Sequence, residues 1–107
     1  MKRLTGINEL DLINCMYAIR YSIERLNLNN SKDSKKILLG ISEKIDSCIL
    51  DDIALKISNE EEFHLYLSLC FYKEELDLKG EDIGANSINE TLLNMFGDIM
   101  ADIIADI

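Results

Sequence analysis

Three carboxylates recur at intervals of four residues near the end of the 107-residue chain. They are Asp98, Asp102 and Asp106, and no Lys or Arg lies among them. Residues four apart on an α-helix share a face, so this spacing predicts a row of negative charge. Such a row suits a cation, which is either a metal ion or the basic surface of another protein. Because metal sites in helical proteins usually take ligands from several helices, a basic protein is the favoured partner.

The remaining candidate partner-binding residues extend this row or form two further carboxylate groups. Glu90 and Asn94 continue the row, and Met95 is expected in the same polar sector, where it would anchor a partner by apolar contact. The two further groups are Glu60, Glu61 and Glu62, and Glu74, Glu75 and Asp77. Like charges four residues apart destabilise a helix, so helix stability alone does not explain the row. The alternative interpretation is ordinary solvent-facing charge that keeps the protein soluble.

The distribution of charge along the chain is uneven. The net charge is −9, but residues 1–56 carry nine basic and eight acidic side chains. Residues 57–107 carry only two basic side chains, Lys73 and Lys79, against twelve acidic ones. This balance argues against direct binding of nucleic acid or of anionic membranes, both of which need clustered Lys and Arg.

Composition and hydrophobic spacing predict an all-α fold. The chain has no Pro and five Gly, whereas a β-rich chain needs many turns. Apolar residues recur at helical spacing instead. The expected apolar face of the first helix takes Leu10, Ile13, Met16, Tyr17, Ile19 or Arg20, Ile23 and Leu26. The expected fold is a single domain, residues 1–107, with about four helices in a bundle-like arrangement.

Capping residues place the helix boundaries. Asn8 is the expected N-cap of a helix over 8–26, and a second helix begins near residue 34. Ser58 and Glu61 form a capping box for a third helix, which Gly80 ends. Residues 81–86 are expected to be a linker, and a second capping box, Ser87 with Glu90, is expected to open a fourth helix that reaches the terminus.

Residues 51–57 are compatible with two structures. Ile recurs at intervals of four from residue 37 to residue 57, which favours a bent continuation of the second helix. The stretch IALKI, residues 53–57, also alternates between apolar and other residues as a short strand does. We take the bent helix as the working expectation and keep the strand as the alternative.

Cysteine usage and the lack of targeting signals predict a cytoplasmic protein. Cys15, Cys48 and Cys70 are odd in number, far apart and without a Cys-x-x-Cys pair, which is typical of reduced thiols packed in a core. Asn8, Glu9 and Asp11 interrupt any apolar segment of a secretory signal. No apolar run approaches the roughly 20 residues that span a bilayer.

None of the candidate catalytic and cofactor motifs has the residue pattern that its chemistry requires. His64 is the sole histidine, and no nucleophile or orienting acid accompanies it at a recognisable spacing. An EF-hand alignment with Gly80 at the sixth loop position puts Lys79 at the fifth and Asn86 at the twelfth, where the metal needs oxygen ligands and a Glu. No glycine-rich phosphate loop is present. We therefore expect no catalytic residue, no metal and no cofactor.

One short segment resembles the acyl carrier proteins. Asp46, Ser47 and Cys48, followed later by Glu60, Glu61, Glu62 and Phe63, are similar to the Asp-Ser-Leu motif and acidic helix of that family. The resemblance implies phosphopantetheine on Ser47. It covers a few residues, Cys48 replaces the leucine, and Ser47 is predicted inside a helix although the family's serine opens one.

In size, acidity and helical class the whole chain resembles bacterial immunity proteins, which neutralise toxins and share no signature motif. The resemblance implies a small cytoplasmic inhibitor without enzymatic activity. A toxin that cleaves nucleic acid needs a basic cleft, and an acidic, rigid partner can fill it. The alternative is a DNA mimic that blocks a DNA-binding protein, for which the carboxylates should follow two rows at phosphate-like spacing.

Overall fold

The computed structural model describes residues 2–4, 8–29, 32–51 and 55–105 of the chain, and side chains over 8–25, 32–50 and 55–97. Within these residues the chain forms four helices and two short strands. In order they are β1 (Lys2–Leu4), α1 (Glu9–Asn29), α2 (Lys32–Asp51), β2 (Leu55–Ile57), α3 (Asn59–Leu78) and α4 (Asp82–Ala105). The predicted all-α class is confirmed, with a small sheet added to it.

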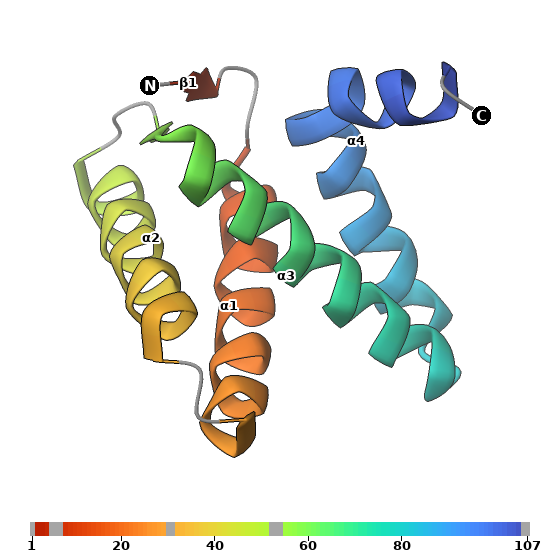
Figure 1. The fold of residues 1–107 in the computed structure, drawn as a ribbon. Coiled ribbons are helices and arrows are strands. Elements are labelled where there is room, and N and C mark those ends of the chain that lie inside the picture. The colour runs from red at the N-terminus through yellow and green to blue at the C-terminus, as the bar shows by residue number, and fades with distance from the viewer. Residues whose placement is uncertain (1, 5–7, 30–31, 52–54, 106–107) are drawn as a thin grey trace.

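Helix α1 is the central element of the fold. It packs against α2, α3 and α4, and α3 also packs against both α2 and α4. Figure 1 shows α2 beside α1, α3 crossing diagonally in front of α1, and α4 on the right beyond α3. The core takes side chains from all four helices and β2, and its largest fully buried members include Phe96, Ile41, Ile45 and Leu69.

The buried face of α1 only partly matches the predicted one. Ile19 of the predicted face is buried, and Met16 and Ile23 pack against the core. Leu10, Ile13 and Tyr17 are exposed, whereas Cys15 and Ala18 are completely buried. The apolar pattern therefore predicted part of the buried face, and packing against the other helices decided the rest.

A buried polar network joins the first helix to the last. The Thr91 hydroxyl donates to the Asp11 carboxylate over 2.8 Å, and the side-chain amide of Asn14 donates to the Thr91 hydroxyl over 2.9 Å. Asn14 also donates to the Ser87 hydroxyl, and Asn94 to the second oxygen of Asp11. Asp11, Asn14 and Thr91 are buried. These hydrogen bonds fix the relative position of α1 and α4, because breaking one would leave a buried polar group unpaired.

Three of the predicted helix ends are confirmed in atomic detail. The Asp11 amide donates to the Asn8 side chain over 2.9 Å, and Asp11 accepts from the Asn8 amide in return. Ser58 and Glu61 form the predicted capping box at the start of α3. At the other end of α3, Gly80 has a positive φ of 74°, the conformation in which glycine ends a helix without steric cost.

The predicted start of the fourth helix is wrong. Helix α4 begins at Asp82, and its first turn includes a hydrogen bond from the Ala85 amide to the Glu81 carbonyl. Ser87 therefore lies inside the helix, where its hydroxyl accepts from Asn14 and caps nothing. The chain reverses within the tight turn at Gly80, so no linker over residues 81–86 is needed.

The working expectation of a bent helix over residues 51–57 is also wrong. Helix α2 ends at Asp51, and Leu55–Ile57 is a strand that pairs antiparallel with β1, with Arg3 opposite Lys56. Leu55 and Ile57 are buried and Lys56 between them is exposed, as the strand alternative requires. Residues 52–54 lie outside the described residues.

Helix α4 is not straight. Phe96 has non-helical backbone angles, φ −130° and ψ 23°, and Figure 1 shows the helix changing direction along its length. The Phe96 ring is completely buried and meets the Tyr66 ring edge-on, with centroids 5.6 Å apart. This contact holds the bend against α3.

Candidate protein-binding surface at the α3–α4 turn

The predicted carboxylate row lies beyond the described side chains. Asp98 and Asp102 belong to α4, after its bend at Phe96. Asp106 lies outside the described residues. The row therefore remains a prediction.

Met95 does not lie in a polar sector, and this prediction is wrong. Only 4% of its side chain is exposed, and its sulfur accepts a contact from the Cys15 thiol over 3.4 Å. Helix α4 packs against both α1 and α3, so its buried arc is wider than the apolar spacing indicated and includes this position. Glu90 and Asn94 are exposed as predicted.

The carboxylates at the start of α3 are partly used by the fold itself. Glu61 accepts from the Lys44 ammonium over 2.6 Å and from the Ser58 amide over 2.9 Å. Burial works against the charged form of Glu61, but these hydrogen bonds outweigh it and hold the pKa of the carboxyl below its usual range. Glu60 is exposed and Glu62 is half-buried.

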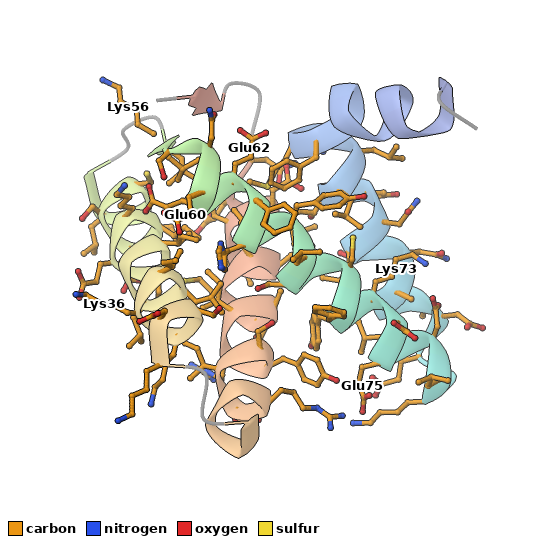
Figure 2. The ribbon with its side chains drawn as sticks, in the orientation of Figure 1. Lys36, Lys56, Glu60, Glu62, Lys73 and Glu75 are labelled. Carbon is orange, nitrogen blue, oxygen red and sulfur yellow. The ribbon has the colours of Figure 1, made fainter. Side chains whose placement is uncertain are left out.

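The second predicted group lies at the far end of the same helix. Figure 2 shows Glu60 and Glu62 near one end of α3 and Glu75 near the other. Fourteen residues of helix separate Glu60 from Glu74, which corresponds to about 21 Å. The predicted carboxylates of α3 therefore form two separate groups rather than one surface.

Glu75 is the most engaged member of this second group. It accepts from the Tyr21 hydroxyl over 3.2 Å and lies 3.4 Å from the Arg25 guanidinium and 3.3 Å from the Lys79 ammonium. The hydrogen bond from Lys79, with the contacts from Tyr21 and Arg25, lowers the pKa of the Glu75 carboxyl. Glu75 thus joins α3 to α1, while Glu74 and Asp77 face solvent.

Two exposed apolar side chains lie close in the chain to the exposed carboxylates of this end. Leu78 is 78% exposed and Ile83 is 89% exposed, and both face away from the core at the turn between α3 and α4. We define the turn surface by six exposed residues: Glu74, Asp77, Leu78, Glu81, Asp82 and Ile83. Apolar side chains inside a charged rim are typical of surfaces that bind other proteins.

Sequence reasoning missed four of the six residues of this surface, Leu78 among them. Glu81, Asp82 and Ile83 were assigned to a linker, where their positions could not be fixed. The available signal was Gly80, because a glycine that ends one helix, followed directly by acidic residues, is also compatible with the first turn of the next helix.

The turn itself is held rigidly by backbone hydrogen bonds. The Gly80 amide donates to the Asp77 carbonyl over 3.1 Å, and the Glu81 amide donates to the Leu76 carbonyl over 2.9 Å. This pair of bonds is the Schellman arrangement that ends many helices. Leu78 and Ile83 are therefore presented by fixed backbone, which lowers the entropy lost when a partner binds.

A groove of about 730 Å³ adjoins the turn surface. Its lining includes Glu81, Asp82 and Ile83 as well as Tyr17 and Tyr72. Tyr17 is exposed although its ring is large and amphipathic. Aromatic side chains beside carboxylates suit contact with Lys or Arg of a partner, because the ring face also attracts cations.

Basic residues compensate only part of the charge at this end of the molecule. Between residues 73 and 83 there are five carboxylates and two ammonium groups. Lys73 pairs with Asp77 over 3.0 Å, and Lys79 pairs with Glu75. Among the described residues, Glu74, Glu81 and Asp82 form no ion pair with Lys or Arg, so the turn surface carries excess negative charge.

The remaining residues that the sequence singled out are Ser47, His64 and the three cysteines. Ser47 is exposed inside α2, near the end of that helix rather than at its start. The His64 side chain is half-buried, with Nδ1 2.9 Å from the Glu60 carbonyl oxygen. Cys15 and Cys48 are buried and Cys70 is half-buried, and all three are free thiols. Burial raises the pKa of the Cys15 thiol, and the nearby Asp11 carboxylate raises it further.

Over the described part of the chain, no group of three or more His, Cys, Asp or Glu side chains is placed to hold a metal ion. None of the helices there is both long and apolar enough to cross a membrane. Comparison with known proteins found no matching family model, no matching curated protein and no matching solved structure.

Proposed function

We propose that this protein binds a basic protein in the cytoplasm and neutralises it, as an immunity protein neutralises a nuclease toxin. The observation that supports the proposal is the turn surface, where Leu78 and Ile83 are almost fully exposed within a rim of carboxylates. The partner would supply Lys or Arg to the rim and an apolar contact to the centre.

The physical advantages of this arrangement are speed and specificity. Excess negative charge accelerates encounter with a basic partner and disfavours acidic ones. Apolar contacts at the centre of an interface usually contribute most of the affinity, while charges at the rim contribute less. The active-site cleft of a nuclease must itself be basic in order to hold phosphates, so it matches the turn surface in charge.

The carboxylate row of α4 remains a second part of the proposal. Asp98, Asp102 and Asp106 would form a separate acidic face, whereas Glu90 and Asn94 lie before the bend at Phe96 and so do not continue that row along one straight helix. The two faces can be distinguished by experiment, because they share no residue.

The test is affinity capture from cells of the native organism at physiological salt, with four baits. They are the wild type, a turn variant (Glu74→Gln, Glu81→Gln, Asp82→Asn), a row variant (Asp98→Asn, Asp102→Asn, Asp106→Asn) and a control variant of α2 (Asp33→Asn, Glu43→Gln, Asp46→Asn). The last three each remove three negative charges. Asp33, Glu43 and Asp46 are exposed and lie on another helix, so the control separates local binding from net charge.

We expect one basic protein on the wild-type and control baits, and at least a tenfold loss of its affinity for the turn variant. The captured protein is then purified and assayed for nuclease activity, which an equimolar amount of the wild type should abolish. Equal capture by the turn and wild-type baits would refute the role of the turn surface. Capture of a DNA-binding protein that duplex DNA displaces would instead identify a DNA mimic.

A further inference from the structure

The groove beside the turn surface has a lining without basic side chains. Its volume is about 730 Å³, which is within the usual range for ligand sites. Among the described residues no Lys, Arg or His lines it, and its polar lining comes from Asn14, Tyr17, Tyr72, Glu81, Asp82 and Ser87. Because Glu81 and Asp82 form no ion pair with Lys or Arg of the described chain, the groove favours a cationic ligand over an anionic one.

Hydrogen bonds inside the protein fix the orientation of the Asn14 side chain in this groove. The Thr91 hydroxyl donates its only proton to Asp11 over 2.8 Å, so toward Asn14 it can only accept. The Asn14 atom that lies 2.9 Å from the Thr91 hydroxyl is therefore the donor, Nδ2, which also donates to Ser87. The carbonyl oxygen Oδ1 must then take the other side of the amide group, away from Thr91.

The Oδ1 atom of Asn14 is an acceptor that has no donor among the described residues. Asn14 is 7% exposed, and its three hydrogen bonds all start from Nδ2. Over the same part of the chain, Ser22 Oγ is the one buried side-chain polar atom that is both unpaired and closed to solvent. Asn14 Oδ1 is unpaired but does not belong to that class, so it touches solvent. Since Asn14 lines the groove, a ligand there that donates a hydrogen bond can reach this oxygen.

The protein already holds one guanidinium with the same kinds of group. The Arg25 guanidinium lies 5.2 Å from the centroid of the Tyr21 ring and donates from Nη2 to Glu75 over 3.4 Å. The groove offers the same combination without an arginine, because it places the Tyr17 ring, which is 52% exposed, in one lining with two unpaired carboxylates. A guanidinium is planar and weakly hydrated, so it can stack on an aromatic ring and donate to several acceptors at once.

We propose that this groove binds one guanidinium group. It would donate to Asn14 Oδ1, lie against the Tyr17 ring, and be attracted by the carboxylates of Glu81 and Asp82. The source of the group rests on the proposed function, in which it is an arginine side chain of the basic partner. A lysine ammonium fits less well, because it is compact and strongly hydrated and gains less from the tyrosine ring.

The first test titrates isotope-labelled protein with three probes at physiological salt, followed by two-dimensional NMR. The probes are N-acetyl-arginine methylamide, its lysine counterpart, and its citrulline counterpart, which has nearly the shape of arginine without the charge. We expect saturable binding of the arginine probe, with shifts of the Asn14 side-chain amide and of backbone amides at the α3–α4 turn. The citrulline probe should bind about 5-fold or more weakly, because it lacks charge-assisted hydrogen bonds, and the lysine probe should also bind more weakly.

Three results of this titration would overturn the proposal. They are absence of saturable binding of the arginine probe, equal or tighter binding of either comparison probe, and shifts that map away from the groove. The Asn14 side-chain amide is the decisive signal, because it reports on the buried acceptor without any substitution in the polar network that joins α1 to α4.

The second test removes the ring and the carboxylates. Tyr17→Ala should weaken the arginine probe by about 2- to 5-fold, the range for one exposed cation–π contact. Phe63→Ala, which removes an exposed ring of α3 that does not line this groove, should leave its affinity unchanged.

The carboxylate variant is Glu81→Gln with Asp82→Asn, and its control is Glu43→Gln with Asp46→Asn at exposed positions of α2. Both remove two negative charges, and only the first should weaken the arginine probe. Equal weakening by the two variants would reduce the effect to net charge and overturn the proposal. Circular dichroism and urea unfolding verify that each variant is folded.

A fifth bait, Tyr17→Ala, in the affinity capture separates this inference from the proposed function. We expect it to hold the basic protein more weakly than the wild type does. If the turn variant loses the protein while Tyr17→Ala holds it as the wild type does, the assignment of the groove to the partner's arginine is overturned and the proposed function stands. If the arginine probe binds in the groove but no bait holds a basic protein, the proposed function fails and the guanidinium site stands.

Discussion

At the scale of single residues, Glu61 and Glu75 illustrate how neighbours decide what a carboxylate does. Both were predicted to bind a partner, which stays a prediction, and both accept hydrogen bonds from cations of this chain, Lys44 in one case and Lys79 with Arg25 in the other. Glu74 and Glu81 have the same chemistry but face solvent. Glu74 and Glu81 can therefore bind a partner without breaking a contact within the chain.

Glu61 gives the protein a pH-dependent part of its stability. Because the pKa of Glu61 is lowered from its ordinary value of 4.5, its contribution is present above that value and is lost as the pH falls through the folded-state pKa. Glu61→Gln keeps a capping side chain but loses the charge that Lys44 pairs with. We expect it to lower the free energy of unfolding by about 1 kcal/mol at pH 7 and by less at pH 3.

Urea unfolding at both pH values measures this difference. Glu60→Gln, at the neighbouring exposed position, is the matched control and should change stability little at either pH. A loss for Glu61→Gln that is the same at pH 3 and pH 7 would show that the Lys44 pair is not its source.

At the scale of elements, the Schellman turn at Gly80 decides where α3 ends, and α4 begins two residues later. Gly80 has a φ of 74°, which costs any residue with a Cβ about 1 kcal/mol or more. Gly80→Ala should therefore lower the free energy of unfolding by about 1 kcal/mol. It should also weaken partner binding, because the turn presents Leu78 and Ile83.

Gly40→Ala is a control for which we expect the opposite change in the free energy of unfolding. Gly40 lies inside α2, and an added Cβ there would meet nothing within 4 Å. Gly40→Ala should raise the free energy of unfolding by up to about 1 kcal/mol, because alanine favours the helix and restricts the unfolded chain. Thermal unfolding of both variants tests the pair, and a shift of the same sign in the two would contradict this account.

The elements that sequence reasoning predicted are those with local causes. The caps at Asn8 and Ser58 depend on side chains within three residues of the helix end, and the stop at Gly80 depends on the backbone conformation of that residue. Strand β2 was only an alternative, because its partner β1 lies some fifty residues earlier in the chain. The start of α4 was missed because Ser87 and Glu90 satisfy the local capping pattern, although Ser87 meets Asn14 of another helix instead.

At the scale of the whole molecule, the Asp11–Thr91 hydrogen bond connects helices 80 residues apart in sequence. Thr91→Val keeps the shape of the side chain and removes the hydroxyl that Asp11 and Asn14 both contact. We expect a loss of about 1–3 kcal/mol in the free energy of unfolding, the range for leaving buried polar groups unpaired. Ser47→Ala, which removes an exposed hydroxyl, should change it by less than about 0.5 kcal/mol.

Urea unfolding followed by both fluorescence and circular dichroism measures these changes. If α1 and α4 form one cooperative unit, the two probes should give coincident transitions in Thr91→Val as in the wild type. A change below 0.5 kcal/mol would show that the network contributes little to holding the two helices together.

The sequence by itself determined the helical class, the cap-defined helix ends and the excess of negative charge in the second half of the chain. These follow from composition and from interactions between residues a few positions apart. The tertiary structure alone decided that Leu10 is exposed although it was expected in the core, and that Met95 is buried although it was expected at the surface. It also decided that β2 is a strand and that the Ser22 hydroxyl is buried without a hydrogen-bond partner among the described residues. Each of these depends on which helices pack together, and burial is a property of that packing rather than of the local pattern.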